Sequence, residues 1–247
     1  MENWLEFEDG ISEQELDNYL ANGWFRMKQS LFTTDETYDN SFVRLLFWLR
    51  VNIPAVKLGK KQKRIYKKTQ SFTIEIGEWK LNNEIENLWQ KYISYIDFFA
   101  LTSVSAYLFN NESGDIKNIF NTKMVTIRDN GRLIAVGYFD IASNSIAAIL
   151  HFYDPEYRSF SLGKYLMLLE MDYARNNNKQ FYYTGYIGIG INKFDYKLFC
   201  DINATEVYVP QDDEWVLWNT IGKVGLEQKF FDFDDDLLKE LDAIDLD

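Results

Sequence analysis

The sequence predicts an α/β (α+β) protein built on a mixed, mostly antiparallel sheet. Two features of the second half of the chain predict this class. The tripeptide Asp129-Asn130-Gly131 stands between two β-rich runs and is a strong signal for an antiparallel hairpin. Farther along, a strand, an amphipathic helix and another strand follow between Ser145 and Ile187, the order of a crossover that joins two parallel strands.

The first half of the chain supplies one well-marked helix and three extended runs. Ser12 is a good N-cap, and Glu15 three residues later completes a capping box. Gly23 follows the apolar helix face as a C-terminal stop. Extended segments are predicted over Trp24–Phe32, Ser41–Ile53 and Ser71–Ile76.

The remaining elements follow in a regular order. Between Asn82 and Phe109 apolar residues recur every three or four positions, over a length sufficient for two helices. The hairpin occupies Met124–Ile141. After it the sequence predicts a strand at Ser145–Tyr153, a helix at Ser161–Arg175, a strand at Gln180–Ile187, a short helix at Phe194–Phe199, and strands at Glu206–Val209 and Glu214–Trp218.

This element order resembles the acyltransferase fold of the GNAT superfamily. In that fold the strands before and after the crossover splay apart and expose backbone groups to the acyl donor. The N-terminus of the crossover helix offers free N–H groups to phosphate. We therefore expect a small α+β N-terminal region at residues 1–80, a GNAT-like domain at residues 81–231, and an acidic C-terminal helix or tail at residues 232–247.

Composition limits the cofactors and the location that we expect. The chain has 247 residues, with one cysteine and one histidine. Cys200 therefore has no partner for an internal disulfide, and a cysteine-based zinc or iron–sulfur cluster is excluded. The start of the chain lacks the basic residues and apolar stretch of a secretory signal, and no apolar run suits a membrane span. We expect a cytoplasmic protein without a metal or membrane site.

Charge is distributed unevenly along the chain. The net charge is −12, but it is concentrated at the two ends, since Met1–Asp17 contains seven acidic residues and no basic one. The basic run Lys57–Lys68 contains no acidic residue. Such a run suits a phosphate backbone, and Tyr66 within it is able to stack on a base. The alternative is a solvated basic surface.

Five short motifs follow one another in the second half. They are Phe152-Tyr153-Asp154-Pro155, Ser161-Leu162-Gly163-Lys164-Tyr165, Ala174-Arg175, Tyr182-Tyr183-Thr184-Gly185-Tyr186 and Lys193-Phe194-Asp195-Tyr196-Lys197. Together they resemble the C-terminal half of the aminoacyl-tRNA–protein transferases, the arginyl enzymes of eukaryotes and the leucyl enzymes of bacteria. Gly23-Trp24-Phe25-Arg26 and the basic element Lys60–Arg64 are similar, more weakly, to N-terminal elements of that family. The family's Cys-x-x-Cys pair is absent, because Ser30–Pro54 contains no cysteine.

The resemblance implies an enzyme that moves arginine or leucine from tRNA to an acidic protein N-terminus and so marks the protein for degradation, the N-degron pathway. Aminoacyl-tRNA is then a co-substrate, proteins beginning with Asp or Glu are the acceptors, and no cofactor is required. Residues expected to bind the tRNA donor are Trp24, Arg26, Lys60, Lys61, Lys63, Arg64, Arg158, Ser161, Leu162, Gly163 and Lys164. Those expected at the acceptor are Tyr153, Asp154, Tyr183, Gly185, Lys193, Tyr196 and Lys197.

Physical reasons support several of these assignments. The N–H groups that begin the helix after Ser161 suit a phosphate or a developing oxyanion, and Gly163 lets the backbone approach closely. Lysines suit an acidic acceptor. Glu170 and Tyr186 are the candidate catalytic residues, with Glu170 as a base on the crossover helix. We expect His151 to be a structural histidine.

Two other functions are compatible with the same fold. A GNAT acetyltransferase would use acetyl-coenzyme A, whose pyrophosphate loop has the pattern Gln/Arg-x-x-Gly-x-Gly/Ala. Arg158–Gly163 keeps the first and last positions of this loop but has Ser161 at the middle glycine. A non-catalytic binding module would keep the fold and use the N-terminal part and the acidic C-terminal helix for protein contacts.

Overall fold

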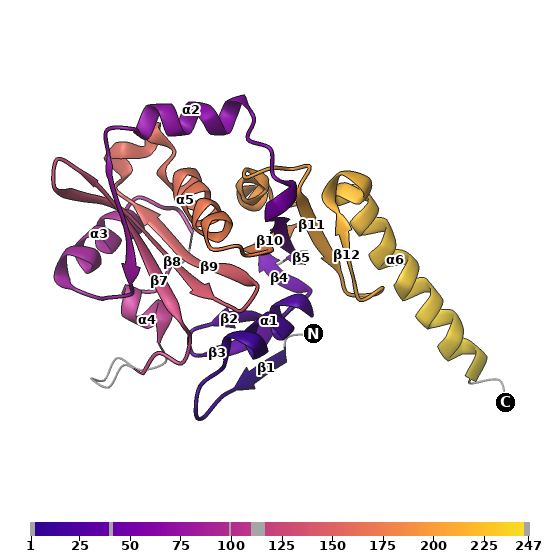
Figure 1. The fold of residues 1–247 in the computed structure, drawn as a ribbon. Helices are drawn as coiled ribbons and strands as arrows, with labels where there is room; N and C mark the ends of the chain where they lie inside the picture. Colours follow the sequence, from indigo (N-terminus) through magenta and orange to yellow (C-terminus); the bar gives the residue numbers. More distant parts are fainter. Residues whose placement is uncertain (1–2, 40–41, 99, 110–116, 245–247) are drawn as a thin grey trace.

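The computed structural model describes residues 3–39, 42–98, 100–109 and 117–244. A nine-stranded sheet forms the centre, and a three-stranded sheet of N-terminal residues packs beside it (Figure 1). One face of the large sheet is covered by α2 (Lys60–Thr69) and α5 (Leu162–Asn176), and the other by α3 (Asn83–Ile93) and α4 (Val104–Leu108). The structure confirms the mixed α/β class with a mostly antiparallel sheet.

The strands follow the chain order closely. The small sheet contains β1 (Asn3–Glu6), β2 (Phe25–Met27) and β3 (Ser30–Thr33), with α1 (Glu13–Ala21) after β1. The large sheet contains β4 (Glu36–Asp39), β5 (Phe42–Asn52), β6 (Thr73–Glu78), β7 (Thr122–Asp129), β8 (Arg132–Ile141), β9 (Ser145–Tyr153), β10 (Phe181–Gly188), β11 (Thr205–Val209) and β12 (Glu214–Leu217). The other elements are the 3-10 helices η1 (Ile53–Ala55), η2 (Pro155–Phe160) and η3 (Asn192–Leu198), and the helix α6 (Trp218–Ile244).

Strands β9 and β10 lie side by side near the middle of the large sheet. The strand order is β12-β11-β5-β10-β9-β8-β7-β6, with β4 paired to β5 outside this path. Among the strands of the described residues, β9 and β10 form the one parallel pair, and α5 connects them. They pair only over Ser145–Ala147 and Phe181–Tyr183 and then separate. The predicted splay of these strands is confirmed.

Helix α5 fixes the geometry at the open end of this splay. Its residues Leu162, Leu166 and Met171 are completely buried, in a core that also contains Phe139 and Ile146 of the sheet. The helix forms along this face because apolar side chains recur at spacings of three and four residues. Each such side chain contributes about 1.5–3 kcal/mol when it is fully buried. The start of α5 is thereby held near the end of β9.

The structure corrects two sequence-based expectations about the N-terminal residues. The run Trp24–Phe32 is two strands and not one, since Lys28 has a φ of +57° and turns the chain between β2 and β3. The boundary at residue 80 is also wrong, because β5 lies between β11 and β10, and β6 pairs with β7. Strands β4, β5 and β6 therefore belong to the same sheet as the GNAT-like domain.

The acidic C-terminal segment is helical, as expected. Helix α6 continues to Ile244, with a break in helical geometry at Gly222. The side chains from residue 232 onward lie outside the described part of the structure. Within the described residues, no helix combines the length and the apolar character needed to cross a membrane.

Candidate active site

The candidate active site lies in the gap where β9 and β10 separate. A bulge interrupts the pairing of β10 with β5 between Tyr183 and Gly185, and Gly185 has a φ of +100°. A side chain is strained at this φ, and a Cβ there would approach the Lys197 Nζ to 2.8 Å. Gly185 thus leaves room beside the β10 backbone for the amine of Lys197. The structure brings together these two residues, which the sequence assigned to the acceptor.

The N-terminus of α5 borders the open end of the gap. Ser161 precedes the helix with a φ of +57° and provides no side-chain cap. The N–H groups of Leu162, Gly163 and Lys164 donate no hydrogen bond to another described residue. A Cβ at Gly163 would meet only the Tyr153 ring, at 3.7 Å, so the backbone is open to a ligand. Free N–H groups at a helix start favour an anion.

Helix α2 adds a basic surface beside the N-terminus of α5. It lies across α5 (Figure 1), where the Tyr66 hydroxyl donates to Asp172 Oδ2 at 2.6 Å. Tyr66 is therefore engaged within the protein and is not free to stack on a base. The predicted tRNA-binding side chains on α2 and the nearby Arg158 are all exposed: Lys60, Lys61, Lys63, Arg64 and Arg158.

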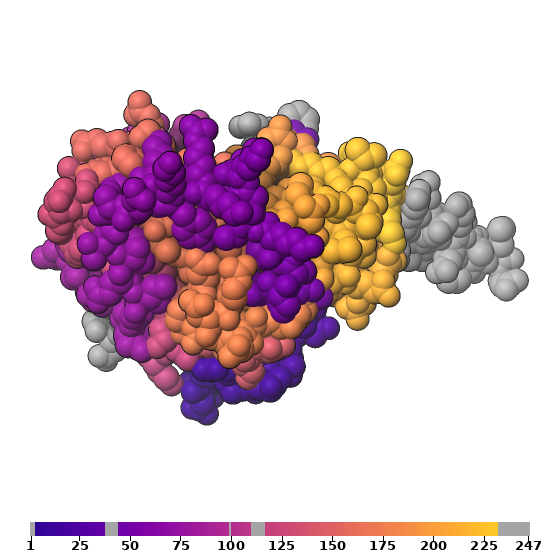
Figure 2. Space-filling model, turned by 45° about the horizontal axis from the view of Figure 1, so that its top comes forward, coloured from indigo at the N-terminus to yellow at the C-terminus, as the bar shows by residue number. Residues whose placement is uncertain are grey.

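The basic helix and the segment around η3 share one face of the molecule. Figure 2 shows the purple atoms of α2 on the same face as the orange atoms of the η3 segment. A hydrogen bond joins the two regions, because Gln62 Nε2 donates to the backbone oxygen of Phe199 at 2.5 Å. A ligand bound along α2 therefore has a continuous surface toward the gap.

An open pocket of about 630 Å³ extends the basic surface from α2 to the C-terminal end of α5. Its lining includes the cations Lys63, Arg175 and Lys179, and no carboxylate is among the lining residues. Lys179 Nζ donates to the backbone oxygens of Ala142 and Ser143 at 2.6 and 3.0 Å. In a chain with a net charge of −12, this local excess of cations suits a phosphate-bearing ligand.

Tyrosines from five elements line the other side of the gap. The rings of Tyr153 on β9 and Tyr92 on α3 have centroids 5.5 Å apart. Although 41% of Tyr196 is exposed, burial of its hydroxyl raises its pKa, as do the nearby hydroxyls of Tyr92, Tyr186, Tyr107 and Tyr153. These phenols remain protonated at neutral pH and offer hydrogen bonds and flat surfaces to a base or side chain.

Lys197 is the cation of this tyrosine cluster. Its Nζ lies 4.1 Å from the centroid of the Tyr186 ring and 5.0 Å from that of Phe194. The side chain is half-buried and forms no ion pair with a carboxylate of the described residues. Burial lowers the pKa of Lys197 to about 7. Because a desolvated ammonium without a counter-ion gains from an anionic partner, Lys197 is suited to receive a carboxylate. Lys193 is exposed at the edge of the cluster.

The two catalytic candidates occupy different positions. Tyr186 lies at the gap, beside Lys197. Glu170 is completely buried, with Oε1 2.7 Å from His151 Nε2 and Oε2 accepting a hydrogen bond from the Tyr182 hydroxyl at 2.6 Å. The hypothesis that Glu170 itself acts as a base on the substrate is therefore wrong, because the protein encloses its carboxylate.

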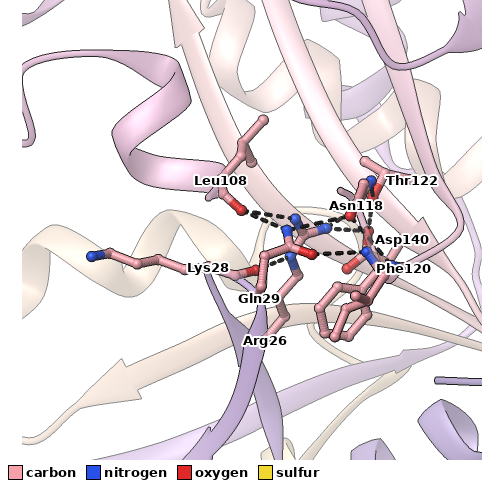
Figure 3. A network of polar contacts seen from close by, with 9 residues as sticks. Arg26, Lys28, Gln29, Leu108, Asn118, Phe120, Thr122 and Asp140 are labelled. Atoms are coloured by element: carbon pink, nitrogen blue, oxygen red, sulfur yellow. Dashed lines mark hydrogen bonds and ion pairs between the residues drawn. The ribbon is translucent and has the colours of Figure 1, made fainter. Parts of the chain in front are cut away.

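Arg26 belongs to the core and not to a tRNA-binding surface. Its guanidinium donates to Asp140 Oδ1 and Thr122 Oγ1, both at 2.8 Å, and to the backbone oxygen of Leu108 at 3.1 Å (Figure 3). Only 1% of each charged side chain is exposed. Burial lowers the pKa of Arg26 and raises that of Asp140, and the ion pair opposes both changes. The prediction for Arg26 is wrong because its guanidinium joins the small sheet to β7 and β8.

Asp154 also has a structural role in place of the predicted acceptor contact. Its buried carboxylate pairs with Lys91 Nζ at 2.8 Å and with Arg132, and it accepts the backbone N–H of Glu156 at 3.0 Å. Burial raises the pKa of Asp154, but these hydrogen bonds outweigh burial and hold the pKa below its ordinary value. Asp154 thus caps η2 and holds the chain between β9 and α5.

Tyr183 and Trp24 lie away from the gap, among the side chains of the N-terminal region. Tyr183 is 2% exposed, and its ring packs edge-on against Phe25 with centroids 5.8 Å apart. Trp24 packs against Tyr19 with centroids 6.2 Å apart. The prediction of an acceptor contact for Tyr183 is wrong, and the structure does not bring Trp24 to the start of α5.

Several residues of the site were missed by sequence reasoning. Tyr92 and Tyr107 lie on predicted helices, where an aromatic residue indicates only core packing. Arg175 could have been identified from the sequence, because it ends the Ala-Arg motif. No motif in the sequence pointed to Lys179. These residues meet only through the tertiary fold, so spacing along the chain does not connect them.

The fold and the site together define a GNAT-like acyltransferase with a basic surface beside the splayed strands. A family model described as "Arginine-tRNA-protein transferase, C terminus" matches residues 62–201. This match covers more than half of the chain and includes most of α2, the splayed strands, α5 and η3. The chain therefore belongs to the arginine-tRNA-protein transferase family.

Curated relatives and solved structures extend this comparison. An aspartate/glutamate leucyltransferase of Vibrio vulnificus (strain YJ016) is 25% identical over 178 residues, 69% of this chain and 72% of that protein. One from Leptospira interrogans serovar Lai is 24% identical over 219 residues, 86% of this chain and 82% of that protein. Arginyl-tRNA–protein transferase 1 of Arabidopsis thaliana is 36% identical over 94 residues, 36% of this chain and 15% of that protein. The ribosomal-protein-S18-alanine N-acetyltransferase from Escherichia coli aligns with a TM-score of 0.31 and 14% identity, over 42% of this chain and 61% of that chain.

Proposed function

We propose that this protein is an aminoacyl-tRNA–protein transferase that moves arginine or leucine from tRNA to a protein beginning with Asp or Glu. The observation that carries the proposal is the gap between β9 and β10. An open helix N-terminus borders one side of it, and the ammonium of Lys197 lies at the other without a carboxylate partner among the described residues. The first suits the phosphates of the donor, and the second suits the acidic side chain of the acceptor.

Helix α2 and the adjoining pocket supply the contacts for tRNA. Exposed Lys60, Lys61, Lys63 and Arg64 neutralise phosphates and release their counterions, which favours binding at low salt. Phosphates bound along α2 lie close to the start of α5, because Lys68 of this helix donates to the backbone oxygen of Ser159. Tyr153, which lies next to the α5 backbone there, offers a surface on which the terminal adenine stacks.

Lys197 gives the acceptor site its preference for acidic residues. A carboxylate that reaches Nζ forms a charge-assisted hydrogen bond and supplies the counter-ion that the half-buried ammonium lacks. Hydrogen bonds to charged groups contribute about 1.5–3 kcal/mol. That range is sufficient to select Asp over the isosteric, uncharged Asn at the acceptor N-terminus.

The transfer itself depends mainly on positioning. The α-amine attacks the ester carbonyl carbon, a C–N bond forms, the bond to the 3′-terminal ribose oxygen of tRNA breaks, and a proton passes from the nitrogen to that oxygen. The ester is already activated, and holding two reactants in orientation supplies roughly 7–11 kcal/mol. Beyond Ala147 the backbone N–H groups of β9 that face β8 stay paired with that strand, whereas those that face the gap no longer pair with β10 and are available to stabilise the oxyanion.

We further propose that the reaction takes place in the cytoplasm and marks its acceptors for degradation. No cofactor is needed in this scheme, because aminoacyl-tRNA already carries the activated acyl group. A second candidate donor, acetyl-coenzyme A, is favoured by one observation: Ser161 has a φ of +57°, a backbone conformation natural to the glycine of a pyrophosphate-binding loop.

A transfer assay read by mass spectrometry tests the proposal. The protein is mixed with total charged tRNA and with peptides that begin with Asp, Glu or Ala. We expect the Asp and Glu peptides to gain the mass of one residue, and the size of the gain names the donated amino acid. If verified charged tRNA produces no gain, the aminoacyl-transferase function is contradicted. Acetylation in a parallel reaction with acetyl-coenzyme A would then support the second candidate, and binding of neither ligand would support a non-catalytic module.

A further inference from the structure

A buried polar network lies beside the gap between β9 and β10. Its three side chains come from three elements: His151 from β9, Glu170 from α5 and Tyr182 from β10. His151 Nε2 lies 2.7 Å from Glu170 Oε1, and the Tyr182 hydroxyl donates to Oε2 at 2.6 Å. Because β9 stops pairing with β10 after Ala147, His151 belongs to the part of β9 that borders the gap.

The sheet leaves space for this network at a glycine. Gly137 of β8 pairs directly with His151. A Cβ at Gly137 would lie 2.9 Å from Glu170 Oε1 and 3.1 Å from His151 Cδ2. Glycine weakens the interior of a strand, and it often marks a place where another group approaches closely. Here it lets the carboxylate and the imidazole pack against the sheet.

The hydrogen bonds define which ring nitrogen of His151 is free. Burial and the charge of Glu170 raise the pKa of Tyr182 well above its ordinary value, so the phenol stays protonated and donates. With Oε2 occupied, Oε1 is the acceptor that remains for the Nε2–H of the ring, so in the neutral form of the imidazole Nδ1 carries no proton. Nδ1 has no hydrogen-bond partner among the described residues.

Exposure separates the three residues. The side chain of Glu170 is 0% exposed, whereas that of His151 is 12% exposed. Tyr182 is also completely buried. His151 is therefore the member of the network that a substrate is able to reach, and the titratable groups that face it are Glu170 from α5 and, through Glu170, Tyr182 from β10.

We propose that His151 is a catalytic residue of the transfer, a role that rests on the proposed function. As the neutral α-amine attacks the ester and the C–N bond forms, Nδ1 takes a proton from the nitrogen. The resulting imidazolium returns this proton to the ribose oxygen as the C–O bond to tRNA breaks, which restores the neutral ring. Glu170 and Tyr182 are positioning residues: the carboxylate holds the tautomer and stabilises the imidazolium, and Tyr182 holds the carboxylate.

Steady-state transfer to an Asp peptide tests this role. For His151→Gln we expect kcat to fall by about 10²–10⁴-fold, the usual contribution of acid–base catalysis, while tRNA affinity and the KM for the peptide stay near those of the wild type. The acidic limb of the pH–rate profile should also disappear. Glu170→Gln should retain part of the rate, and the acidic side of its pH–rate profile should be shifted. In His151→Gly, added imidazole should restore part of the lost kcat.

A second measurement needs no variant. His151 is the only histidine of the chain, so the imidazole ¹⁵N signals of the full-length protein without an affinity tag belong to this residue alone. We expect the Nε2–H tautomer at neutral pH. A ring protonated on Nδ1 would overturn the proposal.

The outcomes separate this proposal from the proposed function. The His151→Gln variant could fold, bind tRNA like the wild type and keep the wild-type kcat and pH profile. This result would show that the network has only a structural role between β9 and α5. In that case the proposed function stands and the role of His151 falls. A wild-type protein that transfers nothing to any peptide contradicts the proposed function instead.

Discussion

Two regions of the molecule surround a cation in opposite ways. Where the small sheet meets β7 and β8, the Arg26 side chain is buried, pairs with Asp140 and donates to three further acceptors (Figure 3). At the gap between β9 and β10, Lys197 lies against aromatic rings and the Gly185 backbone, with no carboxylate partner among the described residues. The paired cation holds parts of the fold together, whereas the cation without a carboxylate partner among the described residues remains available to a ligand.

Removal of the paired cation should have the largest effect. Arg26→Met leaves the buried carboxylate of Asp140 without its partner, and we expect the free energy of unfolding to fall by about 3–5 kcal/mol in chemical denaturation. Arg26→Met combined with Asp140→Leu should recover part of this loss, because no charge is then left buried. Equal stability of the single and double variants would contradict the structural role of the pair.

Charge reversal on α2 should strongly weaken tRNA binding without unfolding the protein. In the variant with Lys60, Lys61, Lys63 and Arg64 all changed to Glu, the slope of log affinity against log salt should become shallower by about 3, since each phosphate contact contributes roughly 0.7–0.9. Filter binding over a salt series measures the slope. The control reverses Lys117, which precedes β7, and Lys123, which lies on β7. Unchanged tRNA affinity in the folded α2 variant would remove this helix from the donor site.

Gly185→Ala should impair the site while leaving most of the fold intact. The added Cβ lies 2.8 Å from the Lys197 Nζ, and φ at this position is +100°. We expect a loss of about 1–2 kcal/mol of stability from backbone strain, with a rise in the KM for Asp peptides as the ammonium is displaced. Gly77→Ala is the control, because a Cβ there meets nothing within 4 Å. If Gly185→Ala keeps the KM of the wild type, the bulge is not required for acceptor binding.

The smallest predicted effect is a dependence of acceptor binding on pH. Burial lowers the pKa of Lys197 to about 7, so its ammonium is present below this pH and is lost above it. The KM for an Asp peptide should therefore rise above pH 7, by up to about tenfold per pH unit, which corresponds to 1.36 kcal/mol. Lys197→Arg keeps its charge and should flatten this rise. A KM that stays constant from pH 6.5 to 9 would contradict the role of the ammonium.

Local signals predicted much of the fold. The capping box of α1 forms as expected, with the Ser12 N–H donating to Glu15 Oε2 at 2.9 Å and the Glu15 N–H donating to Ser12 Oγ at 3.2 Å. The hairpin at Asn130 and the crossover through α5 are also present, because each depends on residues close together in the chain.

The site was less predictable, since its chemistry depends on distant partners. Arg26 and Asp140 are 114 positions apart, so no spacing identifies them as a buried ion pair. The family resemblance assigned both Lys197 and Gly185 to the acceptor site. Their contact depends on a bulge in β10, which the sequence does not predict. His151 could not be distinguished from a structural histidine until Glu170 was located beside it.

The role of Lys197 is tested most directly by a comparison of two acceptors in three proteins. Transfer to peptides that begin with Asp or Asn is measured for the wild type and for Lys197→Met, with Lys193→Met as the control. We expect the wild type and Lys193→Met to prefer Asp by about 10–100-fold in kcat/KM, as a charged hydrogen bond of roughly 1.5–3 kcal/mol requires. In Lys197→Met this preference should disappear. A preference for Asp that survives in Lys197→Met would contradict the claim that this ammonium selects the acceptor.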